Sequence, residues 1–291
     1  MKSIKVDVPM HKIPLFFESV KFKETIFALP FAYIGMLLAS EGLPKSDKFI
    51  WITLAMIGAR TFGMTINRIV DRHIDALNPR TKSRHLPTGT LKLMDMYLLS
   101  SLSILLLLFS SYNLNRLAFL LCPLVVVYLA IYPFTKRFTW TANFILGWAL
   151  AIAPSAAWIG IKGNLSWEPV LLSLAVALWA GSFDVIYHVQ DSEFYTRRNL
   201  YSVAKRFGIS TAFIIARIFD VLSVCCFIAL GVLMDLSFPY FIGCLLTAGI
   251  LFYKYYLVSP ANILNLGSSF FRVNGYVSTT MFLGTLISLI I

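Results

Sequence analysis

The stretch RTFGMTINRIVDRHIDALNPRTKSR, residues 60–84, begins inside an apolar segment and ends in a polar, basic one. It carries Asn67, Asp71 and Asp75 at a spacing of four residues. Side chains four residues apart lie on one face of a helix, so these three oxygen-bearing groups point the same way. Carboxylates at membrane depth are costly and mark functional sites. The stretch therefore predicts a helix that carries a polar site at one end of a membrane span.

The rest of the chain has the composition of a polytopic membrane protein. Of its 291 residues, 58% are hydrophobic and 13% are charged. The formal net charge of +11 would suit a nucleic-acid binder, but the basic residues lie in short connectors between apolar runs rather than on one amphipathic face. We therefore expect the lipid bilayer, and no nucleic acid, as a partner. The four cysteines lack a metal-binding spacing, which indicates free thiols.

About nine apolar runs approach the roughly 20 residues that a helical span needs. They are continuously apolar rather than alternating, which favours helices over strands. The sequence thus predicts an all-α bundle in a single transmembrane domain, residues 1–291, with spans at 22–40, 49–69, 93–111, 116–134, 140–161, 169–190, 210–233, 238–257 and 271–291.

The distribution of basic residues predicts the orientation of these spans. Twenty lysines and arginines, Lys254 and Arg272 included, fall in the N-terminal tail and in the connectors of one side, against four on the other side. The positive-inside rule places the richer side in the cytoplasm. We expect a multi-pass protein of the cell inner membrane with its N-terminus and residues 60–84 on the cytoplasmic side. An odd number of spans puts the C-terminus outside.

A second polar cluster closes the expected sixth span, in GSFDVIYHVQDSEFYTRR, residues 181–198. Asp184, Tyr187 or His188, and Asp191 share one helical face, and Glu193 lies just beyond. Both acidic clusters end even-numbered spans, so both emerge on the cytoplasmic side. We expect them to converge on a polar cavity that faces the cytoplasm.

Carboxylates and an amide are hard oxygen ligands and suit Mg²⁺, which commonly bridges protein carboxylates to substrate phosphates. The candidate metal ligands are Asn67, Asp71, Asp75, Asp184 and Asp191. Basic side chains near both clusters can bind a phosphate, and the candidates are Arg68, Arg72, Lys136, Arg137, Arg197 and Arg198. A diphosphate bound in this way is a good leaving group, because its developing negative charge is neutralised.

Three pieces of the chain resemble the UbiA superfamily of intramembrane aromatic prenyltransferases: NRIVDRHID at 67–75, YPFTKRFT at 132–139 and DVIYHVQD at 184–191. The resemblance covers nearly the whole chain. The first motif of the superfamily is usually written N-D-x-x-D-x-x-x-D, and here Arg68 replaces its first aspartate.

The second motif resembles D-x-x-Y-x-x-x-D and is matched by Asp184, Tyr187 and Asp191. Some members carry another aspartate four residues later, where this chain has Tyr195. Glu193 is a candidate to supply that oxygen instead.

The resemblance implies a UbiA-like helical bundle and a Mg²⁺-dependent transfer of a polyprenyl group from polyprenyl diphosphate to a ring carbon of an aromatic acid, in ubiquinone or menaquinone biosynthesis. The form NRIVDRHIDALNPRT is most similar to the 4-hydroxybenzoate polyprenyltransferase-like branch, which includes enzymes of the futalosine route to menaquinone. The acceptor, 4-hydroxybenzoate or a related hydroxynaphthoate, stays open. The expected catalytic residues are Asp71, Asp191, Arg60 as a partner of the acceptor carboxylate, and Tyr187.

Two other functional classes use related features. A secondary transporter also places acidic residues in broken helices, but near mid-bilayer rather than at one interface. Enzymes that transfer lipid headgroups with Mg²⁺ concentrate their acids in one short motif, which this chain lacks. A purely structural interpretation also exists for individual residues: the acids of residues 60–84 would pair with neighbouring arginines, Arg60 with Asp71, and His188 would be a hydrogen-bond partner rather than a general base.

Overall fold

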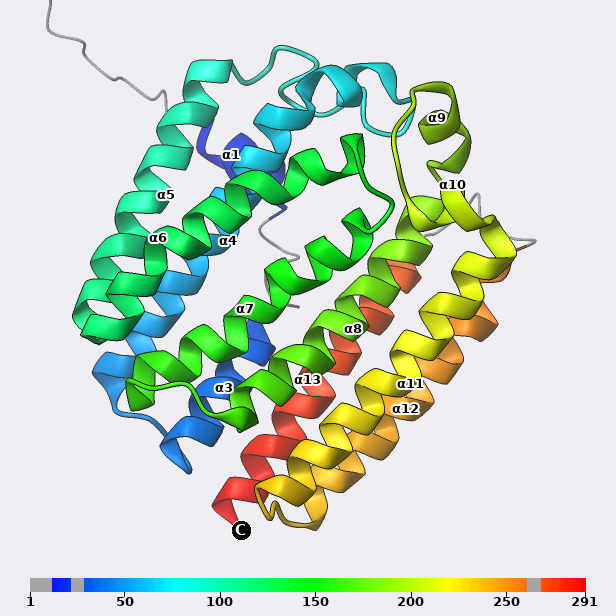
Figure 1. Cartoon of the computed structure of the whole chain (residues 1–291). Helices are drawn as coiled ribbons and strands as arrows, with labels where there is room; N and C mark the ends of the chain where they lie inside the picture. The colour runs from blue at the N-terminus through cyan, green and yellow to red at the C-terminus, as the bar shows by residue number, and fades with distance from the viewer. Residues whose placement is uncertain (1–11, 22–28, 261–267) are drawn as a thin grey trace, which may run out of the picture.

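The computed structural model describes residues 12–21, 29–260 and 268–291, and the regular secondary structure of this part is entirely helical (Figure 1). The expected all-α fold is confirmed. In chain order the helices are α1 (Ile13–Ser19), α3 (Leu29–Ser40), α4 (Ser46–Leu77), α5 (Leu93–Leu114), α6 (Arg116–Ile131), the 3-10 helix η2 (Tyr132–Arg137), α7 (Ala142–Lys162), α8 (Trp167–Val189), α9 (Ser192–Arg197), α10 (Val203–Phe207), α11 (Ile209–Leu233), α12 (Phe238–Leu257) and α13 (Ser268–Ile290).

Eight of the described helices are long and apolar enough to cross a membrane, and they match the last eight expected spans. The first expected span, 22–40, corresponds to the shorter apolar helix α3, and its residues 22–28 lie outside the described part. Helix α4 differs most from the expectation, because it has 32 residues and continues to Leu77. At a rise of 1.5 Å per residue it is about 48 Å long, more than the roughly 30 Å of a hydrocarbon core. The acidic residues therefore sit on a helical extension of the span.

The helices form an elongated bundle whose two ends differ (Figure 1). Helices α9 and α10 and the connection between α4 and α5 gather at one end, and the C-terminus lies at the other. Helices α7 and α8 pack closely because glycines face each other. A Cβ atom on Gly147 would lie 2.4 Å from the carbonyl oxygen of Ala177 and 2.9 Å from the backbone nitrogen of Gly181. Small residues at such contacts let membrane helices approach closely.

The main hydrophobic core lies between α3, α7, α8, α11, α12 and α13. Its aromatic centre contains Phe31, whose ring centroid is 4.9 Å from that of Trp179 and 6.1 Å from that of Phe227. Tyr240 is fully buried beside them and donates a 2.9 Å hydrogen bond to the carbonyl of Phe227. This core joins the helix that carries the second acidic cluster, α8, to the C-terminal half of the bundle.

A charged pair is buried between α11 and α12, in contact with α8. The Lys254 ammonium lies 2.5 Å from a carboxylate oxygen of Asp220 and 3.2 Å from the hydroxyl of Ser182. Tyr255 donates a 2.5 Å hydrogen bond to the same carboxylate oxygen. The side chains of Lys254 and Asp220 are 0% and 4% exposed. The assignment of Lys254 to a cytoplasmic connector is therefore wrong: hydropathy detects a cation near a helix end but not its buried partner on another helix.

Candidate active site

The first acidic cluster lies on the last turns of α4, where the four-residue spacing brings its members to one face as predicted. Asp71 and Asp75 are 2% and 5% exposed. The Asn67 amide donates a 3.2 Å hydrogen bond to Asp71, and the Arg68 guanidinium donates a 3.2 Å bond to the Asn67 amide oxygen. Arg68 also donates a 3.3 Å bond to the carbonyl of Ser19, at the end of α1. The residue that departs from the resembled motif thus anchors α1 beside the site.

Helix η2 supplies the cations that neutralise Asp71. The Lys136 ammonium forms an ion pair with Oδ2 of Asp71, and the Arg137 guanidinium lies 3.5 Å from Oδ1. Arg137 also donates a 2.8 Å bond to the carbonyl of Val70. The backbone N–H of Tyr201 donates a 2.7 Å bond to the carbonyl of Lys136, which ties η2 to the segment after α9. The predicted pair Lys136 and Arg137 therefore reaches the first acidic cluster.

The connection between α4 and α5 folds back over the same cluster. Arg84 donates from Nη1 to both oxygens of Asp75, at 2.8 and 2.7 Å. The hydroxyl of Thr81 donates a 3.1 Å bond to the Asp75 carbonyl. Asp75 therefore faces a guanidinium that comes from beyond the helix rather than from a neighbouring turn.

The second acidic cluster begins near the end of α8. Asp184 accepts a 2.8 Å hydrogen bond from the Asn143 amide of α7, and its carboxylate lies 3.1 Å from Nδ1 of His188. Asn143 is 2% exposed, and its amide oxygen accepts a 3.2 Å bond from the backbone of Val203. His188 is thereby a hydrogen-bond partner of Asp184. The Asn143 amide therefore orients the Asp184 carboxylate.

Asp191 lies after α8 and is held by the α4–α5 connection, more than 100 residues earlier in the chain. The Asn78 amide donates a 3.0 Å bond to its Oδ1, and Nε of Arg80 donates another, also at 3.0 Å. The Nη2 atom of Arg80 pairs with Oδ2 of Asp191, and its Nη1 atom contacts the Tyr187 hydroxyl. Asn78 and Arg80 thereby tie the connection that follows the first acidic cluster to the second acidic cluster.

The charges around Asp191 set the protonation states of this group. Burial favours a raised pKa for Asp191, but hydrogen bonds and positive charge from Arg80 outweigh it and hold the pKa below its usual value. Burial likewise opposes the charge of Arg80, yet its hydrogen bond to Asp191 and the nearby charges raise its pKa. Burial raises the pKa of the Tyr195 phenol well above its ordinary value. At neutral pH this corner therefore holds a carboxylate, a guanidinium and a neutral phenol.

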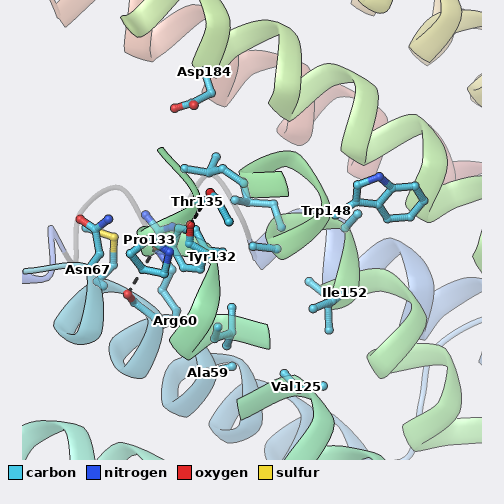
Figure 2. Close-up of a pocket in the computed structure, with 18 of the residues that line it drawn as sticks. Ala59, Arg60, Asn67, Val125, Tyr132, Pro133, Thr135, Trp148, Ile152 and Asp184 are labelled. Atoms are coloured by element: carbon cyan, nitrogen blue, oxygen red, sulfur yellow. Dashed lines mark hydrogen bonds between the residues drawn. The ribbon is translucent and has the colours of Figure 1, made fainter. Parts of the chain in front are cut away.

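The two clusters line one cavity of about 690 Å³. Figure 2 shows Asn67 on α4 and Asp184 on α8 facing the open space, with Arg60 and Tyr132 near Asn67. The cavity continues as an apolar channel along α7, from Asn143 at the polar end to Ile159, and is lined there by side chains such as Val125, Leu146, Trp148 and Ile152. The 16 residue steps from Asn143 to Ile159 correspond to about 24 Å of helix. One end of the cavity suits a charged group, and the rest suits a long apolar chain.

Four expectations from the sequence, for Arg72, Arg197, Arg198 and Glu193, are not supported by this geometry. Arg72 donates to the carbonyl of Ile69, and Arg198 is exposed after α9; neither is among the described residues that line the cavity. Glu193 is 78% exposed and pairs with Arg197 at 2.5 Å. The suggestion that Glu193 supplies an oxygen to the second cluster is wrong, because α9 turns its side chain outward while Tyr195 turns inward.

Sequence reasoning missed the parts of the site that come from the α4–α5 connection. Asn78, Arg80 and Arg84 contact the acidic side chains, although none of the three is among the candidate site residues that the sequence predicts. One signal was available: an asparagine before a proline favours a turn in which its side chain accepts from the backbone two residues on. The Asn78 side chain does accept a 3.0 Å bond from the backbone N–H of Arg80.

Comparison with known proteins identifies the family to which this architecture belongs. The profile of the UbiA prenyltransferase family matches residues 28–276. A 4-hydroxybenzoate octaprenyltransferase from Haemophilus ducreyi is 33% identical over 77% of this chain and 80% of its own length. The structure of a UbiA homologue from Aeropyrum pernix superposes with a TM-score of 0.84 at 28% identity, covering 91% of this chain and 98% of its own. A UbiA homologue from Archaeoglobus fulgidus, solved with GPP and Mg²⁺, has a TM-score of 0.73 at 18% identity. This match covers 95% of the present chain and 100% of the homologue. With its paired acidic clusters and apolar cavity, the chain belongs to the UbiA prenyltransferase family.

Proposed function

We propose that this protein transfers a polyprenyl group from polyprenyl diphosphate to a ring carbon of an aromatic acid, 4-hydroxybenzoate or a related hydroxynaphthoate, for ubiquinone or menaquinone biosynthesis. The observation that carries the proposal is the cavity itself. Four carboxylates, each paired with a cationic or hydrogen-bonding partner, meet at one end of a long apolar channel. The name of the Haemophilus ducreyi relative supports the choice of acceptor class.

The reaction separates charge, and the cavity has cationic side chains at one end and an apolar channel at the other. The bond between C1 of the prenyl chain and the diphosphate oxygen breaks, and the electron pair leaves with the diphosphate. The allylic carbon then bonds to a ring carbon of the acceptor, and that carbon loses its proton to the released diphosphate. Lys136, Arg80 and Arg84 bind the negative charge that develops on the leaving group. The apolar channel excludes water from the cationic carbon.

The first acidic cluster fits Mg²⁺, since it offers two carboxylates and an amide oxygen on one buried face. Asn67, Asp71 and Asp75 would hold the ion, as the sequence predicts. Bound Mg²⁺ would neutralise the diphosphate and so improve it as a leaving group. The Archaeoglobus fulgidus homologue with GPP and Mg²⁺ supports this choice of metal.

The polar end of the cavity also has a candidate partner for the acceptor carboxylate. Arg60 lines the cavity on α4, two helical turns before Asn67, and Tyr132 lies near it (Figure 2). A guanidinium recognises a carboxylate with paired hydrogen bonds. Tyr187, which also lines the cavity, is placed to orient the ring.

We place the protein in the cell inner membrane with the acidic end of the bundle toward the cytoplasm. The excess of basic residues on that side supports the orientation. The C-terminus lies at the opposite end of the bundle and would face outward (Figure 1).

A competition assay tests the proposed function. Purified protein in nanodiscs receives a polyprenyl diphosphate, Mg²⁺, and equal amounts of 4-hydroxybenzoate and 1,4-dihydroxy-2-naphthoate. Mass spectrometry should detect one prenylated acid in excess over the other, together with released diphosphate, and EDTA should abolish both products. Absence of a prenylated product from these acids and from a panel of other phenols would rule the proposed reaction out.

Replacing Arg60 with alanine should weaken binding of the aromatic acid but not binding of polyprenyl diphosphate. We expect the KM for the aromatic acid to rise about 10–100-fold, which corresponds to the free energy of one lost charge-assisted hydrogen bond. The KM for polyprenyl diphosphate should change less than about threefold. Steady-state kinetics with each substrate varied in turn measures both values. Arg116→Ala, at the far end of the bundle on the first turn of α6, is the matched control. Equal changes in both KM values would instead mean that Arg60 has a structural role.

A further inference from the structure

Trp179 on α8 and Asn274 on α13 line the cavity, and each has a buried polar atom without a hydrogen-bond partner in the described part of the chain. The atoms are Nε1 of the Trp179 indole and Oδ1 of the Asn274 amide. The two residues are 3% and 4% exposed. Buried polar atoms without partners are costly and rare in native proteins. In the wall of a cavity, such atoms indicate contact with a bound ligand.

The nitrogen of the Asn274 amide fixes the orientation of its oxygen. Nδ2 donates a 2.8 Å hydrogen bond to the carbonyl of Phe270, one turn earlier on α13. Only the nitrogen of an amide can donate to a carbonyl, so the end without a partner is the oxygen, which accepts. The Trp179 indole nitrogen has the opposite capacity, because it only donates. The wall of the cavity therefore offers one donor and one acceptor.

Two stacked rings show that these atoms lie at one level of the cavity wall. The ring centroids of Phe183 on α8 and Phe270 on α13 are 5.2 Å apart. The two helices are antiparallel, since α8 ends where the acidic clusters gather and α13 ends at the opposite, C-terminal end of the bundle (Figure 1). Away from the acidic end, Trp179 lies four residues from Phe183, and Asn274 lies four residues from Phe270. Each is thus about 6 Å, or one turn, beyond the ring pair.

The same level also matches that of Arg60, the proposed partner of the acceptor carboxylate. Helices α4 and α8 both run toward the acidic end, and their residues Asn67 and Asp184 face the same open space (Figure 2). Arg60 precedes Asn67 by seven residues, and Trp179 precedes Asp184 by five. These separations correspond to about 10 Å and 8 Å along the two helices. Arg60 therefore lines the cavity at a depth comparable to that of Trp179 and Asn274, but on a different helix.

The chemistry of the two atoms selects the group that can bind to both. The oxygens of a diphosphate or a carboxylate only accept hydrogen bonds, so they would leave the Asn274 oxygen unpaired, and a polyprenyl chain has no polar group. A hydroxyl group donates one hydrogen bond and also accepts. The proposed acceptors carry a ring hydroxyl besides their carboxylate. In 4-hydroxybenzoate the two groups lie at opposite ends of the ring.

We propose that Asn274 and Trp179 bind the ring hydroxyl of the aromatic acceptor. The hydroxyl donates to Oδ1 of Asn274, and its oxygen accepts from the indole N–H of Trp179. The inference rests on the proposed function, because it assumes a hydroxylated aromatic acid in the cavity. With its carboxylate at Arg60 and its hydroxyl at this wall, the ring is held at both ends. The hydrogen bond to Asn274 also leaves more electron density on the hydroxyl oxygen and on the neighbouring ring carbons, which favours attack on the allylic carbon.

Binding of two matched acids tests the inference without any turnover. The protein in nanodiscs is saturated with Mg²⁺ and a thiolodiphosphate analogue of a prenyl diphosphate, which resists ionisation. Calorimetric titration then compares 4-hydroxybenzoate with 4-fluorobenzoate, which keeps the carboxylate but cannot donate from the ring. We expect the wild type to bind the hydroxylated acid about 10–100-fold more tightly, because the fluorinated acid leaves both polar atoms unpaired. Equal affinities would overturn the proposal. Naphthoates with and without the hydroxyl replace these acids if the competition assay selects that acceptor.

Two substitutions each remove one of the polar atoms. Asn274→Leu keeps the number and branching of the heavy atoms, and Trp179→Phe keeps an aromatic ring. Each variant should lower the preference for the hydroxylated acid by about 3–10-fold, while the affinity for 4-fluorobenzoate stays within about twofold or rises. A structural role, or a site that holds only water, would leave the preference unchanged and would overturn the proposal. If one variant does not fold, the other still decides.

Trp158→Phe and Thr247→Val are the matched controls. Trp158 on α7 and Thr247 on α12 also carry buried polar atoms without partners, but neither is among the described residues that line the cavity. Both variants should keep the wild-type preference, and a loss in either would overturn a direct contact as its cause. A protein that prenylates the acids while its Asn274 and Trp179 variants keep the preference contradicts only this inference. A wild type that binds neither acid and prenylates none contradicts the proposed function, and the inference falls with it.

Discussion

Asp71→Asn is expected to lower kcat for prenyl transfer by about 10²–10³-fold, the largest catalytic effect of the single substitutions considered. Asp71 is 2% exposed and lies at the centre of the acidic face of α4. It is the residue that both Lys136 and Arg137 contact. Asparagine keeps the shape but removes the charge, so it weakens the metal ligand set and releases the η2 cations together. Losses of this size are typical when one group that stabilises developing charge is removed.

The measurement is the initial rate of prenylated product at saturating Mg²⁺ and substrates, with thermal unfolding recorded in the same detergent. Asp47→Asn is the matched control, because Asp47 is an exposed aspartate on the first turn of the same helix. The control should keep wild-type activity. If Asp71→Asn kept more than about half of the wild-type rate while folded, Asp71 would have no part in the metal site.

Lys254→Met is expected to destabilise the folded protein by about 3–5 kcal/mol without changing the active site. The substitution leaves the Asp220 carboxylate buried without its charge partner, and an uncompensated buried charge costs about this much. Neither Lys254 nor Asp220 is among the described residues that line the cavity. Chemical unfolding in detergent micelles measures the loss, and kcat measured well below the unfolding transition should stay within about twofold of the wild type.

The double variant Lys254→Met with Asp220→Asn separates charge from packing. It removes both charges, while the introduced asparagine keeps an oxygen that can accept the hydrogen bond from Tyr255, so most of the lost stability should return. A double variant that is as unstable as the single one would show that packing of the lysine stem, rather than pairing of charge, explains the loss.

The parts of the site that lie on regular helices could be predicted from the sequence. A spacing of four residues places Asn67, Asp71 and Asp75 on one face whatever surrounds the helix, and the structure confirms that face. The same reasoning identified Asp184 and Asp191. The structure brings both to the cavity, although α8 ends at Val189 and Asp191 lies in the turn beyond it rather than on the same helical face. The metal-binding role predicted for these two residues stays a prediction.

The contacts made by connecting segments could not be predicted. Whether Glu193 or Tyr195 turns inward depends on how the short helix α9 docks, and its six residues carry too little periodic signal to decide this. The partner of Asp75 depends on how residues 78–84 fold back, since Arg68, Arg72, Arg80 and Arg84 are all near in sequence. The pairing of Lys254 with Asp220 joins two helices whose relative rotation no single-helix pattern reports.

The contact between Arg80 and Asp191 also bears on how the protein is made. These residues are 111 positions apart in the chain. At a synthesis rate of about 5–20 residues per second, the ribosome needs roughly 5–20 s to produce Asp191 after Arg80 has appeared. During this interval the newly inserted N-terminal helices lack the anion that Arg80 finally binds. The active site is therefore completed late in biogenesis. Truncated chains that end before α8 are expected to be recognised as unassembled by membrane quality control.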